Sequence, residues 1–128
     1  LILPASEARL HGKEIKYESG HQRDNLGFWT NPGDWADWEF KVTRPGRFEV
    51  SAELAGPEKA SLEISVGSSK TSGAVAPTGD YGKFRVAKFG VIEIPSAGKA
   101  TLAVRPVKEG WHAINLKAIR LKPAAATN

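Results

Sequence analysis

The stretch that decides the fold is residues 26–42, which read LGFWTNPGDWADWEFKV. It holds three of the four tryptophans and joins an Asn-Pro-Gly turn directly to a segment of alternating polarity. In that segment apolar and charged side chains take turns, which is the pattern of a strand with one buried face. We therefore expect Trp38 and Phe40 to lie in the core. Trp29 and Trp35 fall outside this alternation, so the pattern leaves both of them available for another role.

The remainder of the chain repeats this alternation in short segments separated by turns rich in Gly, Pro and Ser. Strands recur about every ten residues, and no helical periodicity lasts longer than one turn. This spacing predicts an all-β fold, a jelly-roll β-sandwich of two antiparallel sheets. Near Gly90 the alternation shifts, which indicates a bulge or bend in one strand. The residues that we expect to be largely buried are Trp38, Phe40, Phe48, Val50, Leu62, Ile64, Phe84, Val86, Leu102, Val104, Leu116 and Ile119.

Length and composition indicate one domain. The chain has 128 residues, of which 41% are hydrophobic and 25% are charged, a balance that suits a single globular core. We expect the domain to span residues 1–122 and residues 123–128 to form a disordered tail. No apolar run approaches the length of a membrane span, so we expect no membrane partner. The chain begins without Met or a signal peptide, and we expect it to be a segment of a longer polypeptide.

Cysteine content and charge limit the kinds of site and of partner that the protein can have. The absence of cysteine excludes disulfide bonds, zinc–thiolate sites and a cysteine nucleophile. The formal charge of +4 permits an anionic partner, but Lys and Arg are dispersed singly and never form a run of three. This dispersal favours a solvated basic surface over a dedicated polyanion site, and we expect no nucleic-acid partner.

Catalysis has only scattered candidates in this sequence. The acids are Asp34, Asp37, Asp80 and Glu109, and His112 is the candidate base. No Ser/His/Asp order, metal-ligand spacing or phosphate-binding loop accompanies these residues. We therefore expect the protein not to be an enzyme.

The order of antiparallel strands predicts which loops share an end of the sandwich. If the turn at Gly33 lies at the first end, loops 55–59, 77–82 and 108–112 lie there too, and tight turns occupy the second end. Loops clustered at one end of a rigid sandwich usually carry binding residues. The aromatic and polar residues that this places at the first end are Trp29, Trp35, Asp80, Tyr81, Glu109, Trp111 and His112. The polar loop of residues 21–25 is a further candidate for this end.

Aromatic faces beside amides and carboxylates suit a sugar ring, because its C–H patch stacks on the aromatic ring while its hydroxyls need donors and acceptors. Trp29, Tyr81 and Asn115 would supply both kinds of group. An alternative interpretation is that Tyr81 and Trp111 only cap the open end of the core.

Three segments resemble carbohydrate-binding modules of families 6 and 35, a jelly-roll group close to the galactose-binding-like fold. Residues 33–40 (GDWADWEF) resemble the family's "GDWxxY" strand, and residues 78–84 (TGDYGKF) resemble its "TGGWxxW" loop. Residues 114–121 (INLKAIRL) are similar to its closing strand "FNLNWIEF". More narrowly, residues 10–12, 24–31 and 121–123 look like the non-catalytic β-sandwich appended to bacterial sulfatases and α-L-fucosidases.

The resemblance implies one site among the loops at one end, where a sugar ring lies between two aromatic side chains and an Asn hydrogen-bonds to it. Carried over, the first aromatic is Trp29 or Phe28, the second is Tyr81, and the polar residue is Asn115. The extra Pro32, relative to the family pattern, leaves the choice between Phe28 and Trp29 open. The full set of candidate ligand-binding residues is Trp29, Trp35, Asp80, Tyr81, Trp111, His112 and Asn115.

The same resemblance indicates whether the protein should hold a structural metal ion. The family's structural calcium is held partly by an acid in the last strand, where this sequence has Arg120. Glu7 alone is a poor calcium site. We therefore expect no metal and no cofactor, and folding that does not depend on calcium.

The function implied is that of a non-catalytic carbohydrate-binding module in an extracellular or periplasmic polysaccharide-degrading enzyme. The expected partners are a polysaccharide, with a fucosylated or sulfated glycan as the first expectation, and a parent catalytic domain in the same polypeptide, sulfatase- or α-L-fucosidase-like. The alternative is an accessory β-sandwich that docks onto its parent enzyme without binding glycan. Its exposed aromatics would then form an interface between domains.

Overall fold

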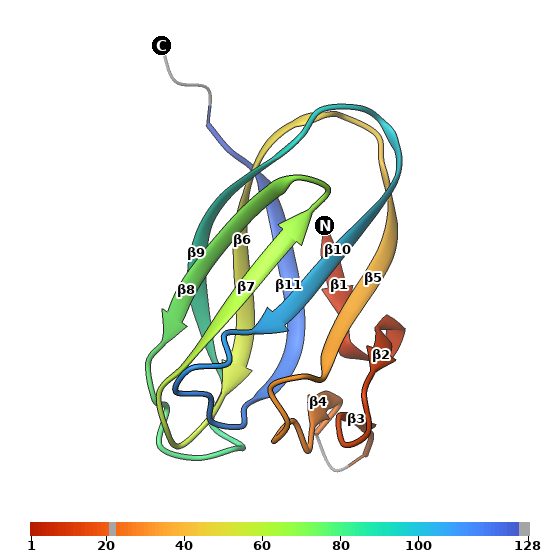
Figure 1. The fold of residues 1–128 in the computed structure, drawn as a ribbon. Helices are drawn as coiled ribbons and strands as arrows, with labels where there is room; N and C mark the ends of the chain where they lie inside the picture. The colour runs from red at the N-terminus through yellow and green to blue at the C-terminus, as the bar shows by residue number, and fades with distance from the viewer. Residues whose placement is uncertain (21–22, 126–128) are drawn as a thin grey trace.

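The computed structural model describes residues 1–20 and 23–125, which form two antiparallel sheets packed face to face (Figure 1). The first sheet contains β1 (Ile2–Pro4), β3 (Lys16–Glu18), β4 (Asn25–Gly27), β6 (Gly46–Ala55), β9 (Arg85–Ile94) and β11 (Asn115–Pro123). The second sheet contains β2 (Arg9–His11), β5 (Trp35–Val42), β7 (Ala60–Val66), β8 (Ser69–Val75) and β10 (Gly98–Pro106). The predicted all-β sandwich is confirmed.

Strand order within each sheet follows a jelly-roll pattern rather than the order of the chain. The first sheet runs β3-β4-β11-β6-β9, with β1 also paired to β11, and the second runs β2-β5-β10-β7-β8. Helical structure in the described residues is confined to one 3₁₀ turn, η1 (Ala5–Glu7). Among those residues, none lies in a helix of the length and apolar character that crossing a bilayer requires.

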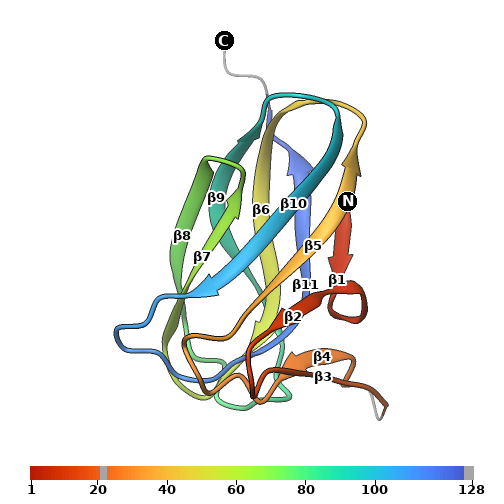
Figure 2. The same cartoon turned by 45° about the vertical axis from the view of Figure 1, so that its right-hand side comes forward.

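The loops divide between the two ends of the sandwich as predicted. The β5–β6, β7–β8 and β9–β10 turns lie at the upper end in Figure 1, and the β4–β5, β6–β7, β8–β9 and β10–β11 loops lie at the lower end. The short strands β3 and β4 lie at this lower end as well (Figure 1 and Figure 2). The lower end, which we call the loop end, therefore gathers chain segments that are far apart in the sequence.

The core lies between the sheets and contains most of the predicted side chains. Phe40 and Phe48 are only half-buried, although both pack against the core. The predicted residues that are buried are Trp38, Val50, Leu62, Ile64, Leu102, Val104, Leu116 and Ile119.

Two predicted core positions, Phe84 and Val86, are wrong, and both errors come from strand β9. The strand begins at Arg85, so the half-buried Phe84 precedes it and gives no information on its parity. Val86 points outward and is 59% exposed. The irregularity predicted at Gly90 is confirmed, because the pairing with β6 skips one residue, Phe89, and this extra residue lies in the core.

The end of the chain stays in the sheet further than expected. Pro123 is the last residue of β11, and the backbone N–H of Ala124 donates to the Arg47 carbonyl at 2.9 Å. Residues 123 and 124, which were expected to belong to a disordered tail, are therefore held by the sheet, and residues 126–128 lie outside the described part of the chain.

Asp34, at the end of the Asn-Pro-Gly turn, joins two segments at the loop end. Its buried carboxylate accepts hydrogen bonds from the backbone N–H groups of Lys13 (3.2 Å), Glu14 (2.9 Å) and Ile15 (3.0 Å). Its backbone carbonyl accepts a hydrogen bond from the indole Nε1 of Trp29 at 2.8 Å. One residue thus fixes the β2–β3 loop and the β4–β5 loop together.

Gly12 makes room for this carboxylate. The residue has a φ of +139°, and a Cβ atom there would lie 2.0 Å from Asp34 Oδ1. Burial acts to raise the pKa of Asp34, but the three backbone hydrogen bonds and the Lys13 charge outweigh it, so the pKa lies below its ordinary value of 3.8. A lowered pKa means that the ionised carboxylate stabilises the folded state.

The first prediction concerns Trp38, which is 1% exposed and donates its indole N–H to the Pro4 carbonyl at 2.7 Å. Replacing Trp38 by Ala should lower the free energy of unfolding by about 3–5 kcal/mol, because it leaves a large cavity in the core. Denaturant unfolding measures the loss, and a value below about 1 kcal/mol would contradict the placement of this side chain.

The second prediction concerns acid stability. Because the folded pKa of Asp34 is depressed, its contribution should be complete above the unfolded pKa of about 3.9 and should be lost as the pH falls below it. The Asp34→Asn variant should be less stable at pH 7 by about 2–3 kcal/mol, since its amide cannot accept all three N–H groups. Its stability should also depend less on pH between 3 and 6. Denaturant unfolding across this range tests both effects, with the exposed Glu93→Gln as control. Equal stability at pH 7 would refute the role of Asp34.

Candidate functional site

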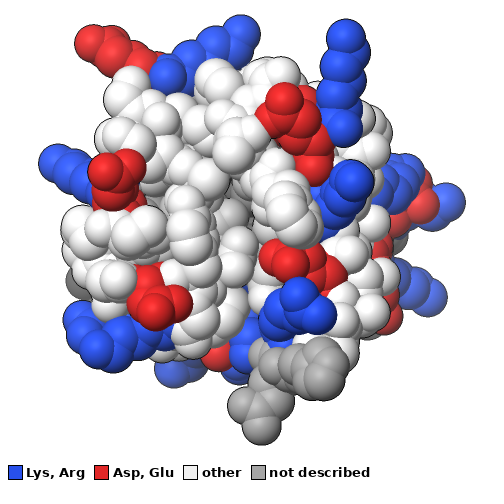
Figure 3. Space-filling model, turned by 90° about the horizontal axis from the view of Figure 1, so that it is seen from below, with Lys and Arg blue, Asp and Glu red and all other residues white. Residues whose placement is uncertain are grey.

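A cleft of about 640 Å³ opens at the loop end, a size that is typical of small-ligand pockets. Seen from this end, uncharged side chains occupy the middle of the surface and charged side chains of both signs surround them (Figure 3). The aromatic residues that line the cleft are Phe28, Tyr81 and Phe84. The polar residues that line it are Glu18, Arg23, Asn25, Thr30, Asn115 and Lys117.

The first wall of the cleft is Phe28, which has an unusual backbone conformation. Phe28 has a φ of +53°, in the left-handed region that a bulky residue adopts at a cost of about 1–2 kcal/mol. The Phe28 side chain is 61% exposed, whereas that of the next residue, Trp29, is 0% exposed. Of the two aromatics left open by the sequence, Phe28 therefore lines the cleft. Trp29 is corrected to a core residue, because its indole has no free face for a ligand.

The second wall is Tyr81, which projects from the β8–β9 loop and is 46% exposed. Asp80 shapes this loop, since its carboxylate accepts the N–H of Gly82 at 2.7 Å and its carbonyl accepts the hydroxyl of Thr78 at 3.0 Å. The backbone carbonyl of Tyr81 in turn accepts the Asn115 side-chain N–H at 3.0 Å. Tyr81 and Asn115, predicted from separate parts of the sequence, thus meet in the cleft.

The polar side of the cleft is made by β3, β4 and β11. Asn25 is buried, and its side-chain nitrogen donates to Glu18 Oε1 at 3.2 Å. A Cβ atom at Gly27 would lie 2.0 Å from Glu18 Oε1 and 3.2 Å from Asn115 Oδ1. Glycine at this position therefore allows both side-chain oxygens to lie over strand β4.

Two cations complete the lining. Arg23 lies with its guanidinium 3.6 Å from Glu18 Oε2. The ammonium of Lys117 lies 4.5 Å from the centre of the Phe84 ring, a cation–π distance. Phe84, predicted for the core, thus supports a charged group at the cleft instead. The residues His21 and Gln22 of the predicted polar loop lie outside the described part of the chain.

Trp111 and His112 do not line the cleft and instead hold loops together. The Trp111 indole N–H donates to the Trp29 carbonyl at 2.9 Å, and the two rings are 5.5 Å apart. Trp111 therefore caps the end of the core, as the alternative interpretation had it. His112 contacts the Lys59 carbonyl at 2.9 Å and Glu58 at 3.2 Å, which joins the β10–β11 loop to the β6–β7 loop.

Trp35 lies on the outer face of the second sheet, away from the cleft. His11 stacks on its ring with 3.9 Å between the ring centroids and 15° between the planes, and the Arg105 guanidinium lies 4.0 Å from the ring centre. Because both groups lie against the indole, Trp35 offers little aromatic surface for stacking on a sugar. Its expected role as a binding residue is not supported by this position.

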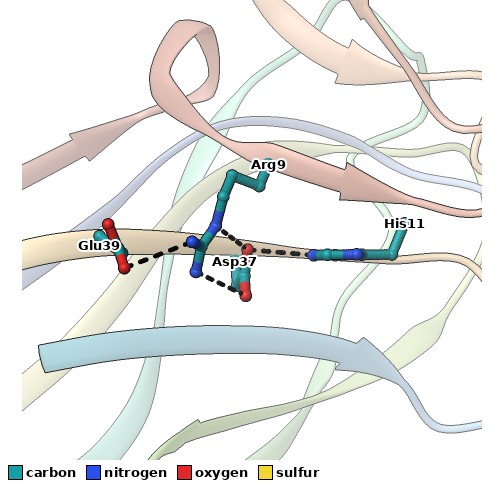
Figure 4. A network of polar contacts seen from close by, with 4 residues as sticks. All are labelled: Arg9, His11, Asp37 and Glu39. Carbon is teal, nitrogen blue, oxygen red and sulfur yellow. Dashed lines mark hydrogen bonds and ion pairs between the residues drawn. The ribbon is translucent and has the colours of Figure 1, made fainter.

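His11, which stacks on Trp35, also belongs to a polar network with Arg9, Asp37 and Glu39 (Figure 4). The Asp37 carboxylate accepts two hydrogen bonds from Arg9, at 2.9 and 3.1 Å, and contacts His11 at 3.1 Å, while Arg9 also lies 3.4 Å from Glu39. Burial acts to raise the pKa of Asp37, but Arg9 and His11 lower it below its ordinary value. These contacts join β2 to β5. They also explain why Asp37 is buried, although the alternation of apolar and charged residues predicts that it faces solvent.

The chemistry available in the cleft is that of binding. Aromatic faces, carboxylate and amide oxygens, and cationic donors lie together, which is the set of groups that a sugar ring needs. No group of three or more His, Cys, Asp and Glu side chains that could hold a metal ion occurs within residues 1–20 and 23–125. The lining residues that the sequence did not point to are Glu18, Thr30 and Lys117, whereas Arg23 and Asn25 belong to the loop of residues 21–25 that was a candidate for this end.

Solved structures with a similar fold include carbohydrate-binding modules. A module from Cellvibrio mixtus lichenase 5A, solved in complex with cellotriose, matches with a TM-score of 0.77 and 16% identity over 98% of each chain. A family 35 module from Clostridium thermocellum matches with a TM-score of 0.79 and 14% identity, over 97% of this chain and 98% of that one.

A larger enzyme also matches. The Podospora anserina GH26-CBM35 β-(1,4)-mannanase has a TM-score of 0.78 and 16% identity over all of this chain, which spans 28% of the mannanase chain. No family model and no curated protein matches the sequence. At these identities the likeness is one of fold: the chain has the two-sheet jelly-roll β-sandwich seen in family 6 and family 35 carbohydrate-binding modules.

Proposed function

We propose that the protein is a non-catalytic carbohydrate-binding module that holds a sugar ring in the cleft at the loop end. The observation that carries this proposal is the meeting of two exposed aromatic side chains, Phe28 and Tyr81, with Asn115 in one cleft. The three residues come from separate loops and strands, and the fold places them together on a rigid support. Such a position is where β-sandwiches usually carry binding residues.

The groups in the cleft match the two surfaces of a sugar. The aromatic rings take its C–H patch, and the oxygens of Glu18 and Asn115 accept hydrogen bonds from its hydroxyls. A shallow site with one or two stacked rings gains only about 4–7 kcal/mol, so the dissociation constant should lie between about 10 μM and 1 mM.

The wider setting is part of the proposal. The similar fold within a β-(1,4)-mannanase, of which this chain spans 28%, supports a module joined to a catalytic domain in the same polypeptide. From the resemblance of residues 24–31 we propose a sulfatase- or α-L-fucosidase-like parent, an extracellular or periplasmic location, and a fucosylated or sulfated glycan. Proteomics of the secreted and periplasmic fractions tests the location.

A docking domain without glycan binding is the second candidate. The observation that favours it is the pair Val86 and Val91, 59% and 37% exposed on strand β9, which another domain could cover. This reading and glycan binding use different surfaces, because neither valine lines the cleft. Solvent accessibility of Val86 and Val91 in the full-length protein tests the docking candidate, because both side chains should be protected there if another domain covers strand β9.

The third prediction tests the binding residues. Tyr81→Ala and Phe28→Ala should each weaken binding to a glycan identified on an array by about five- to thirtyfold, since a stacked ring contributes about 1–2 kcal/mol. The control is Tyr17→Ala, because Tyr17 is an exposed tyrosine that does not line the cleft. Calorimetric titration measures all three variants. Unchanged affinity of both cleft variants, with the fold intact, would favour the docking domain.

A structural calcium ion does not fit the residues present. Glu7 lies in η1, and Arg120 on β11 directs its guanidinium to Glu53 at 3.3 Å. A hard cation needs a cluster of oxygen ligands, which the described residues do not gather here.

The fourth prediction follows from this mismatch. The melting temperature should be the same with EDTA and with added calcium, because no bound ion contributes to the folded state. Differential scanning calorimetry in both buffers checks it. A drop of several degrees in EDTA would contradict the prediction, and a metal analysis of the purified protein would then identify the ion.

A further inference from the structure

The position of Lys117 is set by an irregularity in strand β11. The pairing of β11 with β6 skips one residue between Leu116 and Ala118, and the residue left out is Lys117. Bulges of this kind re-aim a side chain and are common next to binding sites. Lys117 is half-buried and lines the cleft two residues after Asn115.

The ammonium of Lys117 is held in place but lacks a carboxylate partner among the described residues. It lies 4.5 Å from the centre of the Phe84 ring, which covers one side of the charge. In residues 1–20 and 23–125, no Asp or Glu oxygen lies within 4.0 Å of it. The aromatic contact fixes the direction of the ammonium, and its N–H donors remain for another group.

The other charges of the cleft do not offset Lys117. The charged lining residues are Glu18, Arg23 and Lys117. Glu18 is already engaged, by Arg23 at 3.6 Å and by the Asn25 amide at 3.2 Å. The cleft therefore presents one cation in excess beside its aromatic walls, and this excess favours a ligand with negative charge.

We propose that the glycan bound in the cleft carries an anionic substituent, a sulfate ester or a uronate carboxylate, and that Lys117 contacts it. This inference rests on the proposed glycan binding at the same site. A lysine ammonium is a compact charge with three donors, so it accepts either anion without a fixed planar geometry. Its hydrogen bonds to an anion also gain a Coulomb attraction between opposite charges, which a neutral hydroxyl does not offer.

The test uses glycans in matched pairs. An array carries sulfated oligosaccharides beside their desulfated forms, and oligogalacturonides beside their methyl esters. The protein should bind the charged member of a pair at least fivefold more tightly, and the pair that responds identifies sulfate or carboxylate as the anion. Raising NaCl from about 0.05 to 0.5 M should weaken this binding, because exposed charge pairs are screened.

Variants assign the preference to one residue. Lys117→Gln should reduce affinity for the charged glycan about five- to tenfold and affinity for the neutral member by less, whereas Lys117→Arg should keep the preference. The control is Lys122→Gln, which removes an exposed lysine on the same strand outside the cleft. Equal binding of charged and neutral glycans, or equal losses for both in Lys117→Gln, would overturn the proposal.

The same measurements test the anionic substituent separately from glycan binding itself. If neutral glycans bind as well as charged ones and Tyr81→Ala abolishes binding, glycan recognition stands and the anionic substituent is refuted. If no glycan binds, both proposals fail. If Lys122→Gln loses as much affinity for the charged glycan as Lys117→Gln does, the attraction is spread over the surface and the assignment to Lys117 is refuted.

Discussion

The buried carboxylate of Asp34 is the interaction on which the loop end depends. A carboxylate taken out of water is unfavourable unless donors replace the water, and here three consecutive backbone N–H groups, from Lys13 to Ile15, replace it. The same residue accepts the indole N–H of Trp29 through its carbonyl oxygen. Trp29 accepts that of Trp111, so three chain segments are tied in series through buried or half-buried groups.

A buried and an exposed aromatic side chain are neighbours in sequence at the cleft. Trp29 is held inside by its hydrogen bond and by complete burial, and Phe28 before it is exposed and has a left-handed backbone conformation. Burial of the indole, worth several kcal/mol, exceeds the cost of about 1–2 kcal/mol for a left-handed L-residue. The stability of the core thus supports the strained residue at the cleft.

The alternation of apolar and polar residues was enough to predict the sheets, because burial of every second side chain is a property of the strand itself. It identified Trp38 and the strand around it, and the shift at Gly90. The pattern failed where the burial of a side chain depends on where the strand begins or on other segments. The inward direction predicted for Val86 rested on the parity of Phe84, which lies outside the strand, and Asp37 is buried because Arg9 and His11 cover it. The order of the strands placed Tyr81 at the loop end, and the family resemblance then implied its position opposite another aromatic and beside Asn115. Glu18 and Lys117 have no local signal, since only the folded chain brings them together.

The extra residue in β11 shows how one strand serves both core and cleft. Before the extra residue, Leu116 is buried and Asn115 lines the cleft, and the extra residue, Lys117, lines the cleft as well. After it, Ile119 and Leu121 are buried, although strict alternation would place them on the same side as Asn115. The extra residue restores the inward direction for the rest of the strand. A regular strand with this sequence would have to bury Asn115 and Lys117 or leave Ile119 and Leu121 exposed to solvent. The bulge therefore allows β11 to place an amide and an ammonium at the cleft while the later residues of the strand remain packed in the core.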